Sequence, residues 1–192
     1  MNVSRETAAR LELFKTLVIA ENERQNLVSP ASVADFESRH IDDAVQLADL
    51  GQPGSWCDVG SGAGLPGIVI AIVTGAPMTL IEPRKLRADF LRRAVAELGL
   101  DAEVFEGKAE RVPTHFDNIT ARAVADLARL LAITENLAQR GTRWILPKGR
   151  SAKKELEAAQ LSWQGSFSLV PSRTSDEAAI IVAEGVRRRG KR

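Results

Sequence analysis

The sequence predicts an α/β protein with a mostly parallel sheet of seven strands, closed by an antiparallel hairpin and preceded by a helical extension. After Gly54, short apolar segments alternate with longer amphipathic ones, as in parallel sheets with connecting helices. A glycine-rich turn, residues 60–67, follows the first of these strands. The last two apolar segments are joined by the stretch 171–177, which is polar and turn-like and shows no helical pattern, so they should pair antiparallel.

The first fifty residues predict helices. Ser4 is a good N-cap, and apolar residues then recur at helical spacing until the polar segment 22–26. A second helix is expected over 31–50, ended by the Gly-Gln-Pro-Gly sequence at 51–54. We therefore divide the chain into a helical extension (1–51), an α/β domain (52–185) and a basic C-terminal tail (186–192).

The periodic pattern of the remaining chain places its elements. Strands are expected near 55–59, 78–82, 102–106, 117–121 and 143–147, with the hairpin at 166–170 and 178–183. Helices are expected near 65–74, 85–98, 126–139 and 151–161.

Composition limits the possible functions. At 192 residues and 44% hydrophobic, the chain can bury one well-formed core. It has no apolar stretch long enough to cross a bilayer and no signal-peptide pattern, so we expect a cytoplasmic protein. With Cys57 as the single cysteine and His40 and His115 as the only histidines, neither a disulfide nor a metal site is expected. Cys57 is expected to be a small core residue.

The glycine turn is compatible with two cofactors. Gly62 to Gly67 satisfies the G-x-G-x-x-G pattern of dinucleotide sites, and Glu82 lies where such sites place a ribose-binding acid. Asp58, just before the turn, would repel a pyrophosphate but favour the ammonium and sulfonium groups of S-adenosylmethionine. We therefore prefer S-adenosylmethionine, with Gly60, Gly62 and Glu82 as binding residues.

The strand pattern and motifs resemble a known family. Five alternating strands closed by an antiparallel hairpin are similar to class I S-adenosylmethionine-dependent methyltransferases, whose fold is Rossmann-like. The segments that carry a closer resemblance, to the RsmG (GidB) family, are Asn26-Leu27, 39–43, 58–68, Ala109-Glu110, 120–123 and Lys148-Gly149. That family methylates N7 of a guanine in the 530 loop of 16S ribosomal RNA. The resemblance implies cofactor contacts from Gly60, Leu65, Ala109, Glu110 and Arg122. One departure is the segment 81–85, where the family more often has an Asp-Ser-x-x-Lys-Arg sequence.

The sequence lacks the motifs that two other kinds of base methylation require, which is consistent with methylation at N7. The segment after the fourth strand, Thr120-Ala121-Arg122-Ala123, is unlike the Asn/Asp-Pro-Pro-aromatic motif of enzymes that methylate exocyclic amines. Cytosine C5 methylation needs a nucleophilic thiol, and the only cysteine is expected to be buried. Guanine N7 has an available lone pair, so direct in-line displacement needs positioning but no general base.

Two basic residues are candidates to position the base through its O6 acceptor. Arg122 and Lys148 each follow a predicted strand at the edge where ligands bind. The alternative for Arg122 is an internal ion pair with an acid such as Asp126. His40 could reach the site from the extension, but we assign it no catalytic role.

Basic groups suggest a polyanionic partner. Lys and Arg cluster at 84–93, at 108–111, at 140–154 and at the C-terminus, and the six Phe and three Trp are few for a stacking platform. We expect 16S ribosomal RNA, within the small ribosomal subunit, as the substrate of a monomeric enzyme. Charge patterns alone are equally typical of solvated helix faces. The alternatives are a methyltransferase for a small molecule or a protein, and a dinucleotide-binding or non-catalytic module.

Overall fold

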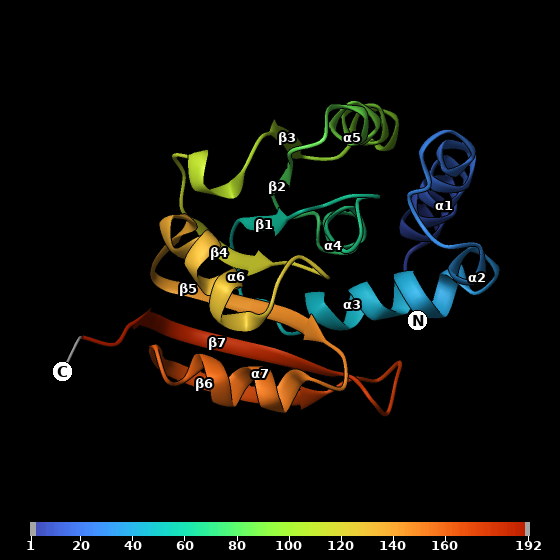
Figure 1. Ribbon diagram of the computed structural model, residues 1–192. Coiled ribbons are helices and arrows are strands. Elements are labelled where there is room, and N and C mark those ends of the chain that lie inside the picture. The colour runs from blue at the N-terminus through green and yellow to red at the C-terminus, as the bar shows by residue number, and fades with distance from the viewer. Residues whose placement is uncertain (1–2, 191–192) are drawn as a thin grey trace.

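The computed structural model describes residues 3–190, and its centre is a seven-stranded sheet (Figure 1). The strands lie in the order β3-β2-β1-β4-β5-β7-β6, and β7 is antiparallel to both of its neighbours while the other pairs are parallel. Their bounds are β1 Trp56–Val59, β2 Met78–Glu82, β3 Ala102–Glu106, β4 Phe116–Thr120, β5 Ala138–Lys148, β6 Trp163–Pro171 and β7 Ala179–Arg188. The predicted parallel sheet with an antiparallel hairpin is confirmed.

Helices cover both faces of the sheet. On one face lie α4 (Gly67–Thr74) and α5 (Lys85–Leu98), and on the other α6 (Leu127–Thr134) and α7 (Ala152–Ala159) (Figure 1). Two 3-10 turns, η2 (Ala109–Arg111) and η3 (Glu135–Leu137), complete the connections. Side chains alternate along β5, so that Ile145 packs with the first group of helices and Trp144 and Leu146 with the second.

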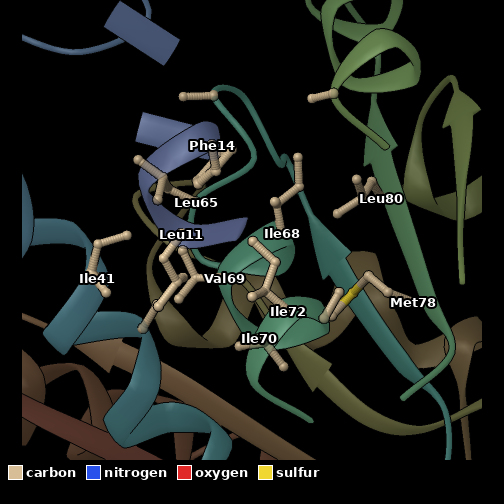
Figure 2. Packing of buried hydrophobic residues seen from close by; sticks show 14 of the residues in the cluster. Leu11, Phe14, Ile41, Leu65, Ile68, Val69, Ile70, Ile72, Met78 and Leu80 are labelled. Atoms are coloured by element: carbon tan, nitrogen blue, oxygen red, sulfur yellow. The ribbon is translucent and has the colours of Figure 1, made fainter. Parts of the chain in front are cut away.

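The helical extension forms a third layer over α4. It consists of α1 (Arg5–Gln25), α2 (Pro30–Ala34), the π-helical turn η1 (Glu37–Asp42) and α3 (Asp43–Ala48). Figure 2 shows Leu11 and Phe14 of α1 beside Leu65 and Val69. Since α4 lies between the sheet and the extension, it is apolar on every side, as a helix enclosed in this way must be.

Helix ends in the extension follow its local sequence. The Ser4 hydroxyl accepts a hydrogen bond from the Thr7 N–H at 3.0 Å, which confirms the predicted N-cap of α1. α1 ends at Gln25, and the residue that caps it, Asn26, has a left-handed conformation with a φ of 45°. The second helix, predicted over 31–50 as one element, is instead interrupted by the π-helical turn η1.

Three predicted boundaries are wrong. The helix predicted over 126–139 ends at Thr134, and β5 begins at Ala138 rather than 143. Residues 186–188, assigned to a basic tail, belong to β7. They remain in the sheet because β6 pairs with them and because the Arg188 guanidinium lies over the Trp163 ring at 4.8 Å. Of the remaining terminal residues, 1–2 and 191–192 lie outside the described residues.

Three further observations concern the cysteine, membrane-spanning helices and metal-binding groups. Cys57 is fully buried, as predicted, and burial raises the pKa of its thiol well above the usual range. Between residues 3 and 190, no helix is both long and apolar enough to cross a membrane. The same residues contain no group of three or more His, Cys, Asp or Glu side chains that could hold a metal ion.

Candidate functional site

The glycine turn lies at the carboxyl end of β1, where the strand order reverses between β1 and β4. Gly60 has a φ of +73°, and its N–H donates to the carbonyl of Ile81 at 2.8 Å. A Cβ at Gly60 would lie 2.7 Å from Cγ2 of Val124, in the loop that follows β4. The positive φ favours glycine here, and a larger residue would also displace the Val124 side chain. The reversal point is where open α/β sheets bind ligands.

Asp58 is a buried carboxylate directly beneath the turn. Its Oδ2 accepts a hydrogen bond from the Gly67 N–H at 3.1 Å, while Oδ1 has no partner among the described residues. Burial raises the pKa of Asp58 to about 6, and the hydrogen bond from Gly67 and the charge of Arg122 oppose this rise only in part. A cationic ligand beside Asp58 would stabilise the ionised carboxylate.

Glu82 ends β2 and connects two loops. Its Oε2 accepts from the Gly62 N–H at 2.9 Å, and its Oε1 accepts from the Arg84 N–H at 2.8 Å. The side chain is buried, so Glu82 is not merely an exposed acid at the start of a helix. Each carboxylate oxygen has a second lone pair, which leaves capacity to accept from a ribose hydroxyl.

The other predicted cofactor residues lie at different depths. Ala109 begins η2 after β3 and is buried, and its carbonyl accepts from the Asn136 side chain at 3.1 Å. Glu110 is exposed next to it. The side chain of Leu65 is part of the hydrophobic core with α1, so any contact from Leu65 to a cofactor would have to come through its main chain.

Arg122 extends from the end of β4 to the helical extension. Its NH1 lies 3.5 Å from Oδ2 of Asp43 and 3.4 Å from Nδ1 of His40. The predicted alternative partner, Asp126, is instead the N-cap of α6, where its carboxylate accepts from the Arg129 N–H at 3.0 Å. Arg122 therefore does form an internal ion pair with a helix acid, as the alternative held, but the partner is Asp43. Asp126 is not the partner because it is engaged by its own helix, as N-cap residues usually are.

His40 lies in the π-helical turn, behind Arg122. Its ring is buried, packs edge-on against Phe36 with 5.0 Å between ring centroids, and has no partner for Nε2 among the described residues. Burial, followed by the charge of Arg122, lowers the pKa of His40 to about 4. The imidazole is therefore neutral at physiological pH and can accept a hydrogen bond from Arg122 through Nδ1.

A cavity of about 540 Å³ adjoins Arg122 and Lys148. Its walls are the loop 122–126 after β4, the end of β5 with Gly149, and single residues from α3, from α7 and from the β6–β7 connection. Lys148 is largely engaged within this wall, because its Nζ donates to the Ala125 carbonyl at 2.7 Å and pairs with Glu155 at 2.9 Å. The loop residue Ala123 has a φ of +57°, a strained conformation for a residue other than glycine.

The structure thus brings the predicted cofactor turn and the predicted base-positioning residues together at one edge of the sheet. Sequence reasoning missed two acids that hold the basic residues, Asp43 and Glu155. Asp43 lies in the segment 39–43 that carried the family resemblance, which was a usable signal. Glu155 has no such signal, because nothing in the sequence distinguishes it from Glu157 on the same amphipathic helix.

Comparison with known families gives a match over most of the chain. Residues 7–176 match the family model described as rRNA small subunit methyltransferase G. The ribosomal RNA small subunit methyltransferase G of Sphingopyxis alaskensis is 45% identical, with 98% of this chain and 84% of that protein covered. The protein of the same description from Rhizorhabdus wittichii is 44% identical, with 98% and 90% covered.

Solved structures share the fold at low sequence identity. A SAM-dependent methyltransferase from Aquifex aeolicus superimposes with a TM-score of 0.61 at 14% identity, covering 88% of this chain and 97% of that one. The glycopeptide N-methyltransferase MtfA, solved with S-adenosyl-L-methionine, gives a TM-score of 0.59 at 12% identity, covering 76% and 94%. Both likenesses show the class I methyltransferase fold that the sequence predicted.

Proposed function

The chain belongs to the rRNA small subunit methyltransferase G family, and from this premise we propose that it transfers a methyl group from S-adenosylmethionine to N7 of a guanine in the 530 loop of 16S ribosomal RNA. The observation that carries the proposal is a contact between two loops. Gly60 of the cofactor turn meets Val124 of the loop that bears Arg122, so a cofactor in the turn would border the cavity beside Arg122. Membership of a methyltransferase family argues against the dinucleotide-binding alternative.

The residues around the turn fit S-adenosylmethionine. Asp58 has a buried carboxylate oxygen without a partner, which suits the positive charge of the cofactor, and Glu82 can accept from ribose hydroxyls. Gly60 and Gly62 leave room along the backbone, and Ala109 and Glu110 follow β3 where the adenine would lie. When bound, the cofactor supplies a methyl group activated by a positively charged sulfur.

The residues of this chain contribute positioning rather than proton transfer. N7 of guanine has a lone pair and no proton, so in-line displacement requires no general base. The surroundings of His40 are consistent with a reaction that needs no general base, since its neutral ring is buried and faces Arg122. Arg122 would donate to O6 on the same edge of the base. Lys148 would approach the base as well, and its contacts with Ala125 and Glu155 would hold the wall of the cavity in place.

The substrate is proposed to be ribosomal RNA in the small subunit, bound by a monomer. Lys153 and Lys154 are exposed at the start of α7, next to the cavity wall formed by Gly149. Phosphate contacts from such residues would add affinity that is independent of sequence and falls as salt increases.

The decisive test offers labelled S-adenosylmethionine and four acceptors to the purified protein: undermethylated small subunits, naked 16S ribosomal RNA, free guanine nucleotides and a protein extract. We expect label on ribosomal RNA, at N7 of one guanine, in the first or second reaction. Label only on free nucleotides or on protein would overturn the proposed substrate.

Variants of the basic residues then test the site. Arg122→Ala should reduce methyl transfer by about 100-fold, the loss typical when one positioning donor is removed. Arg129→Ala removes an exposed charge from the neighbouring helix and serves as the matched control, with activity near wild type. Lys153→Gln with Lys154→Gln should weaken RNA binding and its salt dependence, whereas an enzyme acting on a small molecule would be unaffected.

A further inference from the structure

Arg122 has only part of its guanidinium engaged by the protein. The contacts from Asp43 and His40 both go to NH1, and among the described residues Nε and NH2 have no hydrogen-bond or ion-pair partner. The Arg122 side chain is about a quarter exposed and lines the cavity. One end of the guanidinium is therefore held by the helical extension while the remaining donors are free for a ligand.

Asp43 is itself fixed by two hydrogen bonds. Its Oδ1 accepts from Nε2 of Gln46 at 2.9 Å and from the Thr174 hydroxyl at 2.9 Å, whereas Oδ2 faces Arg122. The two carboxylate oxygens thus have separate tasks, one bound to the scaffold and one bound to the arginine. A carboxylate restrained in this way restrains the charged partner that it contacts.

The scaffold that fixes Asp43 joins the extension to the β6–β7 connection, residues 172–178. Gln46 is buried, and its Oε1 accepts from the Arg173 N–H at 2.8 Å while its Nε2 lies 3.1 Å from the Ser172 hydroxyl. Ala178, at the other end of the connection, lines the same cavity as Arg122. Buried polar groups are costly unless they are satisfied, so this network holds the connection and the extension in one arrangement.

From this network we propose that Asp43 is a positioning residue for methyl transfer: anchored by Gln46 and Thr174, it orients the Arg122 guanidinium toward the substrate base. The inference rests on the proposed role of Arg122. It assigns the helical extension and the β6–β7 connection a direct part in the geometry of the active site, beyond their packing. In this proposal Asp43 acts through Arg122: its Oδ1 accepts from Gln46 and Thr174, and its Oδ2 faces the guanidinium.

The test is a double-mutant cycle on methyl transfer to undermethylated small subunits. Asp43→Asn keeps the size of the side chain and an oxygen for Gln46 and Thr174 but removes the charge that faces Arg122. We expect kcat to fall on the order of tenfold, with the Kd for S-adenosylmethionine and the unfolding midpoint nearly unchanged. In an Arg122→Ala background the same substitution should have almost no further effect, because its partner is absent.

Asp49→Asn is the matched control. Asp49 pairs with Arg173 in the same connection at 2.6 Å, but both side chains are more than half exposed and neither contacts Arg122. Its kcat should stay within about twofold of wild type. Thr174→Val provides a second variant of the network should Asp43→Asn fold poorly, and it should lower kcat by a few-fold, again without further effect in the Arg122→Ala background.

The outcomes separate the two claims. Wild-type activity of Arg122→Ala would overturn the role of Arg122 in the proposed function, and the inference with it. A loss in Arg122→Ala together with wild-type kcat in Asp43→Asn and Thr174→Val would overturn only the inference. An equal fold-loss from Asp43→Asn in both backgrounds would also overturn it, because a purely structural effect is independent of the arginine.

Discussion

At the scale of single residues, Asp58 combines a cost in stability with a benefit in binding. The carboxylate is fully buried, has one hydrogen bond from the Gly67 N–H and leaves Oδ1 without a partner among residues 3–190. An ionised group in such a position destabilises the folded state until a counter-charge arrives. The positive charge of the cofactor would be that counter-charge, so cofactor binding would offset the cost of burying the Asp58 carboxylate.

Asp58→Asn should change stability in a pH-dependent way. Because burial raises the folded-state pKa of Asp58 to about 6, its contribution to stability is fully present below its ordinary pKa of 3.8 and is lost as the pH rises through about 6. Relative to wild type, the Asn variant should therefore gain on the order of 2 kcal/mol between pH 4 and pH 8. Urea denaturation of both proteins at the two pH values measures this difference; an equal stability difference at both would contradict it.

The same substitution should weaken cofactor binding. At pH 8 the ionised carboxylate attracts the cationic cofactor, and near pH 5 the protonated form does not, so wild-type affinity should fall with decreasing pH and the affinity of Asp58→Asn should not. Titration calorimetry with S-adenosylmethionine checks this. S-adenosylhomocysteine, which lacks the positive sulfur, is the control ligand and should be less sensitive to the substitution.

At the scale of elements, the start of α6 determines which acid can pair with Arg122. Asp126 and Arg122 are near in sequence, but α6 begins at Leu127 and uses the Asp126 carboxylate as its N-cap. The loop before it is fixed further by Glu155 of α7, which accepts from the Leu127 N–H at 3.0 Å and pairs with Lys148. The start of α6 is thus set by its own cap and by a neighbouring helix, and Arg122 is left to a distant partner.

Substitutions at Asp126 distinguish a cap from an ion pair. Asp126→Ala should lower the free energy of unfolding by about 1 kcal/mol, and Asp126→Asn should stay close to wild type, because Asn is an equally good N-cap. Thermal and urea unfolding measure both. If Asp126 instead acted through its charge on Arg122, the Asn and Ala variants would lose the same activity and stability.

At the scale of the whole molecule, the helical extension shares the core of the sheet domain. Leu11, Phe14 and Ile41 from the extension belong to the same buried cluster as Ile68 and Ile70 of α4 (Figure 2). A boundary at residue 51 therefore separates chain segments with different patterns but does not separate two cores. We expect the extension and the sheet to unfold together in a single transition.

Phe14→Ala tests this shared core. Phe14 is fully buried and contacts Phe36 edge-on, with 6.5 Å between ring centroids, so its truncation should cost about 3 to 5 kcal/mol. The neighbouring Leu13 is 39% exposed, and Leu13→Ala is the matched control with a small effect. Calorimetry should show one transition at lower temperature for Phe14→Ala. A separate early transition, with the sheet unfolding at the wild-type temperature, would contradict a shared core.

Elements could be predicted from the sequence where neighbouring residues are enough to fix the local structure. The strands and the glycine turn followed from apolar runs and from Gly60, and the first helix from the Ser4 cap. The errors lie where partners distant in sequence intervene. β5 extends back to Ala138, and β7 extends to Arg188 because it pairs with β6, and no local pattern specifies such lengths.

By itself, the sequence determined the α/β class, the family and the position of the cofactor turn beside Asp58, because these depend on residue spacing over short segments. Only the tertiary structure decided the partners of the basic residues. His40 and Arg122 are 82 positions apart, and they meet because the extension packs on α4 and brings the π-helical turn to the end of β4. Which charges pair across such a distance depends on the packing of the whole chain, and no local pattern in the sequence specifies it.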